Sequence, residues 1–229
     1  MHGIIQIAGI IDRAEAEMLL AAGVDWLGFP FRLPVHREDI SEAGAAEIIA
    51  DLKPPHAAVL ITYLNQAPEI ADLCRRLGVR RVQLHGAVPT DEIRRLRRIM
   101  PELFILKSLI VTGDNLPHLE AQVTAYAPLV DGFITDTYDP ETGASGATGK
   151  THDWRISRRL VELSPRPVML AGGLRPENVR EAIRQVRPAA VDAHTGVEAP
   201  SGRKDPHKVR QFVAEARAGF RISGHLPFE

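Results

Sequence analysis

The sequence predicts a single (β/α)8 barrel. Short apolar runs alternate with amphipathic stretches along the whole chain, and this alternation provides eight strand candidates and eight helix candidates. No linker-like break interrupts them, and 229 residues suit a compact version of this fold, so one domain spanning residues 1–229 is expected. The structural alternative is a doubly wound open sheet, which usually has fewer strands and often carries a G-x-G-x-x-G motif that does not follow the first strand here.

Each strand candidate is a short run rich in apolar side chains, and several stop at glycine or polar residues. In chain order they are Ile4–Ala8, Val24–Phe29, Ala57–Tyr63, Arg81–His85, Phe104–Ile110, Gly132–Asp136, Pro167–Ala171 and Ala189–His194. Helical periodicity fills most of the gaps, over residues 13–22, 41–52, 67–77, 90–99, 115–126, 155–163, 176–186 and 206–218. Start signals support several helices, for example Asp12 with Glu15 in a capping pattern and Pro176 in a first turn.

Composition limits the classes of function. The net charge of −1 offers no electrostatic case for a nucleic-acid or membrane partner. No apolar run reaches membrane-spanning length and the N-terminus lacks a signal-peptide pattern, so a cytoplasmic enzyme is expected. The single cysteine, Cys74, excludes an internal disulfide framework and lies at helical spacing, as a packing residue would.

A barrel carries its active site at the C-terminal ends of its strands. Polar and glycine residues gather at these ends in this sequence. They are Gly9, Arg32, Arg37, Gln83, His85, Gly86, Lys107, Asp136, Thr137, Gly172, Gly173, Asp192, His194, Thr195 and Gly196. The sequence therefore places a candidate site at this end of the barrel.

Two glycine motifs indicate a phosphate site. Gly172 and Gly173 follow the seventh strand, and Thr195, Gly196 and Val197 follow the eighth. In barrels these two loops commonly hold a phosphate group, because glycines allow close approach and exposed N–H groups bind the anion. Either motif alone could be an ordinary turn, but the pair in these two loops favours a phosphorylated small-molecule partner.

Several segments, spread over nearly the whole chain, resemble the phosphoribosylanthranilate isomerase family of tryptophan biosynthesis. They are "VQLHG" (82–86), "DGFITDT" (131–137), "GATGKTHDW" (146–154), "LAGGLRPENV" (170–179) and "VDAHTGVE" (191–198) with "GRKDPHKVRQFV" (202–213). The resemblance implies an Amadori rearrangement, in which an aminoaldose phosphate becomes a 1-amino-1-deoxyketose phosphate. It also implies that no metal or organic cofactor is needed.

The resemblance assigns the two proton-transfer roles. A general acid opens the sugar ring by protonating its oxygen, and its motif falls on Asp136. A general base removes a proton from the carbon beside the imine, and in the family this is the cysteine of a "KICG"-like motif. That motif falls on "QIAG", so Gln6 and Ala8 replace the usual lysine and cysteine. Because a methyl group cannot accept a proton, very weak or absent turnover of phosphoribosylanthranilate is expected.

Roles for other residues at the C-terminal ends of the strands follow from their position and from the resemblance. His194 is a candidate replacement base, and His85 is a candidate catalytic residue that could equally orient its loop. Substrate-binding roles are expected for Arg37, Asp192 and Gln83. Lys107 is interpreted as structural rather than as a Schiff-base lysine, since the family keeps a lysine there without such chemistry.

The glycine-rich segment 137–152 is interpreted as a mobile loop after the sixth strand. The predicted function is an isomerase of a phosphorylated sugar or aminosugar, of the Amadori type or a related one. Two alternatives remain open: an epimerase or lyase acting on a similar ligand, and a non-catalytic barrel that binds a phosphorylated metabolite. A homodimer is a further expectation.

Overall fold

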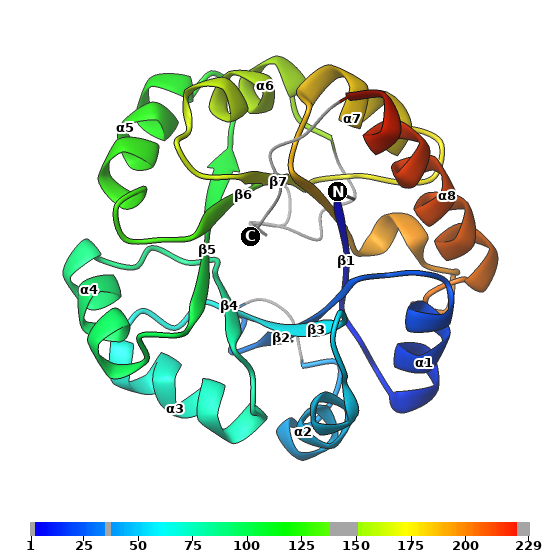
Figure 1. Ribbon diagram of the computed structural model, residues 1–229, viewed down its shortest axis with the longest axis horizontal. Coiled ribbons are helices and arrows are strands. Elements are labelled where there is room, and N and C mark those ends of the chain that lie inside the picture. Colours follow the sequence, from blue (N-terminus) through cyan, green and yellow to red (C-terminus); the bar gives the residue numbers. More distant parts are fainter. Residues whose placement is uncertain (1–2, 35–37, 138–150, 224–229) are drawn as a thin grey trace.

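The computed structural model describes residues 3–34, 38–137 and 151–223, with the side chains of residues 222 and 223 left aside. Eight strands form a closed barrel in the order β1 to β8, each pairing in parallel with the next, and β8 pairs with β1. Helices surround the barrel on all sides (Figure 1). The predicted (β/α)8 barrel is thus confirmed.

The strands lie where the apolar runs predicted them. They are β1 (Ile4–Ala8), β2 (Trp26–Phe31), β3 (Ala57–Thr62), β4 (Arg81–Leu84), β5 (Phe104–Val111), β6 (Gly132–Thr137), β7 (Val168–Leu170) and β8 (Ala190–Ala193). The helices are α1 (Arg13–Ala21), α2 (Glu42–Asp51), α3 (Ala67–Leu77), α4 (Thr90–Ile99), α5 (Leu116–Tyr126), α6 (Trp154–Leu163), α7 (Val179–Val186) and α8 (Pro206–Ser223), with a short 3-10 turn η1 (Thr195–Val197) after β8.

Several expected boundaries differ from those of the structure. Strand β2 runs from Trp26 to Phe31 rather than from Val24 to Phe29, and α8 continues to Ser223 rather than ending at residue 218. Two further differences lie next to the candidate site. Helix α7 begins at Val179 rather than at residue 176, because Asn178 folds the preceding segment into a turn: its side chain accepts from the Arg175 N–H at 2.8 Å. Thr137 belongs to β6 rather than to the following loop. The remainder of that predicted mobile loop up to residue 150 lies outside the described residues.

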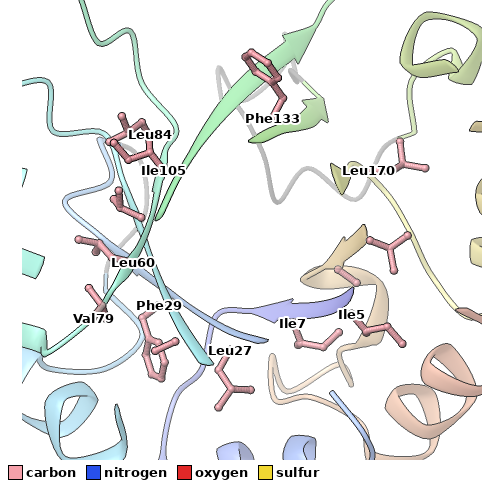
Figure 2. Packing of buried hydrophobic residues seen from close by; sticks show 14 of the residues in the cluster. Ile5, Ile7, Leu27, Phe29, Leu60, Val79, Leu84, Ile105, Phe133 and Leu170 are labelled. Atoms are coloured by element: carbon pink, nitrogen blue, oxygen red, sulfur yellow. The ribbon is translucent and has the colours of Figure 1, made fainter. Parts of the chain in front are cut away.

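Side-chain alternation along the strands separates two apolar cores. On β3, Leu60 belongs to the larger core between the strands and the helices, while Val59 belongs to a smaller core inside the barrel. Figure 2 shows part of the larger core, with Leu60 and Phe29 among its labelled residues. Ala8 belongs to the inner core together with Ile134, so its methyl group faces the barrel interior.

The N-terminal end of the barrel is closed by aromatic side chains. Trp26 and Phe104 meet edge to face with ring centroids 5.8 Å apart, and the Arg81 guanidinium lies 5.1 Å from the Trp26 ring. All three residues lie at strand starts. The inward-facing side chains of Gln83, Asp136 and Asp192 lie toward the opposite end of the barrel, which we call the mouth. Among the described residues, no helix is long and apolar enough to cross a membrane.

Candidate active site

Period-two alternation brings polar side chains to the mouth from strands far apart in the sequence. Ile134 and Ala190 face the inner core, so Asp136 and Asp192, two residues further along β6 and β8, face inward as well. The same alternation on β1 turns Gln6 inward together with Ala8. All of these side chains are buried.

A hydrogen-bonded chain crosses the mouth. The Gln6 amide donates to the Asp192 carboxylate at 3.0 Å and to Gln83 Oε1 at 3.5 Å. The Gln83 amide lies 3.1 Å from His85 Nδ1, and the Ser108 hydroxyl lies 3.1 Å from the same nitrogen. Four strands are thereby linked through side chains. His85 is 5% exposed and held on one ring nitrogen, so this contact orients its imidazole.

Both inward-facing carboxyl groups have pKa values well above their ordinary value of 3.8. Burial raises the pKa of Asp136 to about 7; the Thr137 N–H lowers it and the charge of Asp192 raises it. Burial also raises the pKa of Asp192 to about 7, while the Gln6 amide and the Lys204 ammonium group lower it. At neutral pH this pair can offer one protonated and one ionised carboxyl group, which is what acid–base catalysis needs.

Ala8 ends β1, as predicted, and brings no titratable atom to the mouth. It is 3% exposed, and a side chain on Gly28 would begin 3.0 Å from the Ala8 methyl group. The interior is therefore tightly packed here. Any base at the mouth must therefore be supplied by another element.

His194 lies just beyond β8, against the turn that follows β1. A Cβ atom on Gly9 would lie only 2.2 Å from His194 Nε2, so the ring occupies space that a side chain would need. The same nitrogen is 3.3 Å from Glu198 Oε1, which also binds the buried Lys204 ammonium group at 2.7 Å. The His194 ring therefore contacts the ion pair of Glu198 and Lys204, which lies after β8.

The two predicted phosphate loops pack directly on each other. A Cβ on Gly196 would lie 1.9 Å from the Leu174 carbonyl oxygen, so only glycine fits against the neighbouring loop. Gly173 has φ of 62°, and its carbonyl accepts from the Asn178 side chain at 3.0 Å. Val197 donates its N–H to the His194 carbonyl through a long bond of 3.5 Å.

Gly172 has φ of 94° and is crowded by Thr137 and His152. The His152 ring lies beside it and contacts Ser157 at 2.5 Å, and burial lowers the pKa of His152 to about 4. A neutral, buried histidine therefore supports the loop after β7. His152 ends the segment 137–152 that is predicted to be a mobile loop, and nothing in that segment predicts this buried contact.

Lys107 faces away from the mouth, as its structural interpretation requires. Its ammonium group donates to the Ser108 carbonyl at 2.9 Å and lies 5.7 Å from the Tyr126 ring, and burial lowers its pKa to about 8. Arg37, expected to bind substrate, lies outside the described residues. Within the described ranges, no group of three or more His, Cys, Asp or Glu side chains could hold a metal ion.

Sequence reasoning missed Gln6 and Ser108 as members of the mouth. In the sequence Gln6 is recognisable only as the replacement for a lysine, although its place two residues before Ala8 puts it on the inner face. Ser108 follows Lys107 and carried no motif. Its role depends on contact with His85, which is 23 residues away.

The closed barrel, the buried carboxyl pair and the packed glycine loops define a (β/α)8-barrel protein whose mouth can perform acid–base chemistry. A family model described as N-(5'-phosphoribosyl)anthranilate (PRA) isomerase matches residues 7–215. The chain belongs to this family, which is a family of isomerases.

Individual relatives are similar over nearly their full length. N-(5'-phosphoribosyl)anthranilate isomerase 2 of Methanosarcina mazei is 39% identical, covering 98% of this chain and 99% of the relative. A phosphoribosyl anthranilate isomerase solved in complex with reduced 1-(o-carboxyphenylamino)-1-deoxyribulose 5-phosphate superimposes with a TM-score of 0.77 at 28% identity, covering 93% and 98% of the two chains. Monomers generated from the dimeric enzyme of Thermotoga maritima superimpose with a TM-score of 0.75 at 29% identity, covering the same shares.

Proposed function

We propose that this protein catalyses the phosphoribosylanthranilate isomerase reaction, with Asp136 as the general acid. The observation that carries the proposal is the buried carboxyl pair in the mouth, in a chain that belongs to this family. A carboxyl group with a pKa of about 7 is still protonated near neutral pH and can donate to the ring oxygen of the sugar. The proton then bound to that oxygen allows the C1'–O bond to break.

Ring opening leaves an iminium group at C1', stabilised by the nitrogen lone pair. A base next takes the proton from C2', and the electrons of that C–H bond form an enolamine. Tautomerisation of the enolamine, with a proton added at C1', completes the 1-amino-1-deoxyketose. The chemistry needs one acid and one base in opposite protonation states, which the two carboxyl groups can supply.

The alternatives raised by the sequence have no support among the relatives. The relatives reported above are named isomerases. None of them is named as an epimerase, a lyase or a non-catalytic binding protein. The expectation that Ala8 makes turnover weak likewise gains no support. The proposal also includes substrate binding by Gln83, Asp192 and Arg37. It further includes a homodimer, which light scattering would test.

The first prediction is that the purified protein converts phosphoribosylanthranilate at about 1–10³ s⁻¹, the range of ordinary enzymes. Loss of the starting anthranilate fluorescence would follow the reaction, with heat-denatured protein as the blank for spontaneous decay. A folded sample that binds phosphate but gives no turnover above this blank would favour the silent barrel instead.

The second prediction concerns the phosphate loops. We expect inorganic phosphate to bind at Gly172, Gly173, Thr195, Gly196 and Val197 and so to raise the unfolding temperature, since a ligand that binds only the folded state stabilises it. Sodium chloride at equal ionic strength is the control for general salt effects.

A matched pair of variants locates the bound anion. Asparagine and aspartate both tolerate the left-handed backbone of Gly173, whose φ is 62°, but only aspartate adds a negative charge. Gly173→Asn should keep a reduced phosphate shift, and Gly173→Asp should lose it. Equal shifts in the two variants would place the anion elsewhere.

A further inference from the structure

We propose that Asp192, positioned by Gln6, is the base of the rearrangement and replaces the thiol that the first strand lacks. This inference rests on the proposed function and names the residue that completes it. It adds a catalytic role for Asp192 to the substrate-binding role expected from the sequence. It also assigns Gln6 a role as a positioning residue.

Strand register places the two carboxyl groups in one row. Thr135 pairs with Leu170 on β7, and Leu170 pairs with Val191 on β8. One residue further along each strand, Asp136 and Asp192 stand on either side of Ala171, which belongs to the inner core. Their backbones are about 10 Å apart, two strand spacings, and both side chains point into the barrel. Between them, this row carries only the small side chain of Ala171.

The surrounding charges decide which carboxyl group keeps the proton. The Lys204 ammonium and the Gln6 amide both favour ionised Asp192, and the negative charge of Asp192 then favours protonated Asp136. Glu198 binds Lys204 at 2.7 Å and His194 at 3.3 Å, and so moderates that positive charge. His85 is connected to Asp192 through Gln83 and Gln6. The Thr137 N–H donates to Asp136 Oδ1 at 2.8 Å and favours the ionised form of that carboxyl group as well. Among the groups that shift the two pKa values, however, only Asp192 has a cationic neighbour, and on that contact we assign Asp192 as the base and Asp136 as the acid.

Gln6 holds this base without cancelling its charge. Its register partner on β8 is Asp192, and the hydrogen bond of 3.0 Å fixes the carboxylate toward the mouth. Gln6 is fully buried, and its Oε1 atom has no partner among the described residues. A buried acceptor without a donor is costly, and a sugar hydroxyl bound next to Asp192 would supply that donor.

His194 is the competing base, and its surroundings argue against it. Its Nε2 atom faces Glu198 and the Gly9 backbone, in the loop that packs on the phosphate side. It lies past the end of β8, beyond the row that contains Asp136. Asp192 lies within that row and is 9% exposed, so its charge acts in a largely water-free environment.

The proton transfers balance with these assignments. Asp136 gives its proton to the ring oxygen and becomes a carboxylate as the C1'–O bond breaks. The Asp192 carboxylate takes the C2' proton and becomes a carboxylic acid, while the C–H electrons form the C1'=C2' bond and the iminium electrons return to nitrogen. The enol proton leaves to solvent and a solvent proton adds to C1'. Afterwards Asp192 releases its proton and Asp136 regains one, so nothing is consumed.

Asp192→Asn tests the base directly. Asparagine can still accept the Gln6 hydrogen bond, so the fold should survive, as thermal unfolding would check. We expect kcat to fall about 10²–10⁴-fold with KM changed only a few-fold, and the isotope effect with C2'-deuterated substrate to increase. Asp72→Asn, which removes an exposed carboxylate on α3, is the control and should leave kcat unchanged.

The outcomes separate the inference from the proposed function. Absence of turnover in the unmodified protein would overturn both. An active parent whose Asp192→Asn variant loses only substrate affinity, or keeps its kcat while His194→Gln loses it, would overturn the inference and leave the proposed function standing.

Two substitutions of Gln6 provide a second test, because they should change the pKa of Asp192 in opposite directions. In Gln6→Leu the Asp192 carboxylate loses a donor, so its pKa rises and the acidic limb of the kcat/KM profile moves to higher pH. In Gln6→Lys an ammonium group lies beside Asp192, so its pKa falls and that limb moves to lower pH, by about 1–3 pH units. Opposite displacements are the expected result. Variants that fold but leave the limb in place, or move it in one direction, would overturn the role of Gln6 and of Asp192 as the titrating base.

Discussion

Asp136→Asn should lower kcat/KM for phosphoribosylanthranilate by about 10²–10⁴-fold and should also stabilise the protein above neutral pH. The loss of activity follows because an amide cannot donate the proton that opens the sugar ring. The gain in stability follows because the amide removes a carboxylate that is 7% exposed and has no cationic partner among the groups that shift its pKa.

The sign of the pH dependence follows from the raised pKa of Asp136. Its carboxyl group ionises near 3.8 in the unfolded chain but only near 7 in the folded protein. Between these values the folded state binds more protons, so the free energy of unfolding decreases as pH rises from 3.8 to about 7. Above pH 7 the free energy of unfolding has lost the full contribution of Asp136. The difference between the two pKa values corresponds to at most about 4 kcal/mol.

Urea unfolding of the parent and the variant at pH 5 and at pH 8 measures this effect. The advantage of Asp136→Asn should be larger at pH 8, where the parent must bury a charge. Asp72→Asn changes an exposed residue that is ion-paired with Arg76, and it should show no such gain. A variant that keeps full activity, or whose stability relative to the parent is the same at both pH values, would contradict the assignment of Asp136 as a buried acid.

Gly196→Ala should destabilise the protein by about 1–3 kcal/mol and abolish the phosphate-induced shift. The new methyl group would lie 1.9 Å from the carbonyl oxygen and 2.9 Å from the carbonyl carbon of Leu174. Both are backbone atoms, so no side chain can rotate away. The loop after β7 or the η1 turn must move, and with it the N–H groups proposed to hold the anion.

Gly44→Ala is the matched control for this substitution. Gly44 lies in α2, and the nearest atoms to its added methyl group are side-chain atoms of Ile40 at 3.2 and 3.3 Å, which can adjust. Alanine also favours a helix over glycine by about 1 kcal/mol. Gly44→Ala should therefore be neutral or stabilising and should keep the phosphate shift. An equally stable Gly196→Ala variant that still responds to phosphate would show that the two loops need not pack together.

Much of the fold could be predicted because the information is local. The strand Ile4–Ala8 and the helix after Asp12 are visible from apolar periodicity and a capping side chain, which accepts from the Glu15 N–H at 2.8 Å. Barrel geometry places the active site at the strand ends, and the motif around Asp136 marks it there as the candidate acid. The start of α7 at Val179, and not at residue 176, is less predictable, because a proline occurs in a turn as readily as in the first turn of a helix.

The sequence by itself determined the barrel, the order of its elements and the candidate acid, since these depend on side-chain spacing within a few residues. Only the tertiary structure decided which side chains at the mouth are hydrogen-bonded to one another. Gln6 and Asp192 are 186 positions apart, and their hydrogen bond exists because closing the barrel brings β8 beside β1. The raised pKa values of Asp136 and Asp192 depend on burial, which no local pattern contains. The missing thiol at Ala8 is a local fact, whereas the carboxylate proposed to replace it is found only where distant strands meet.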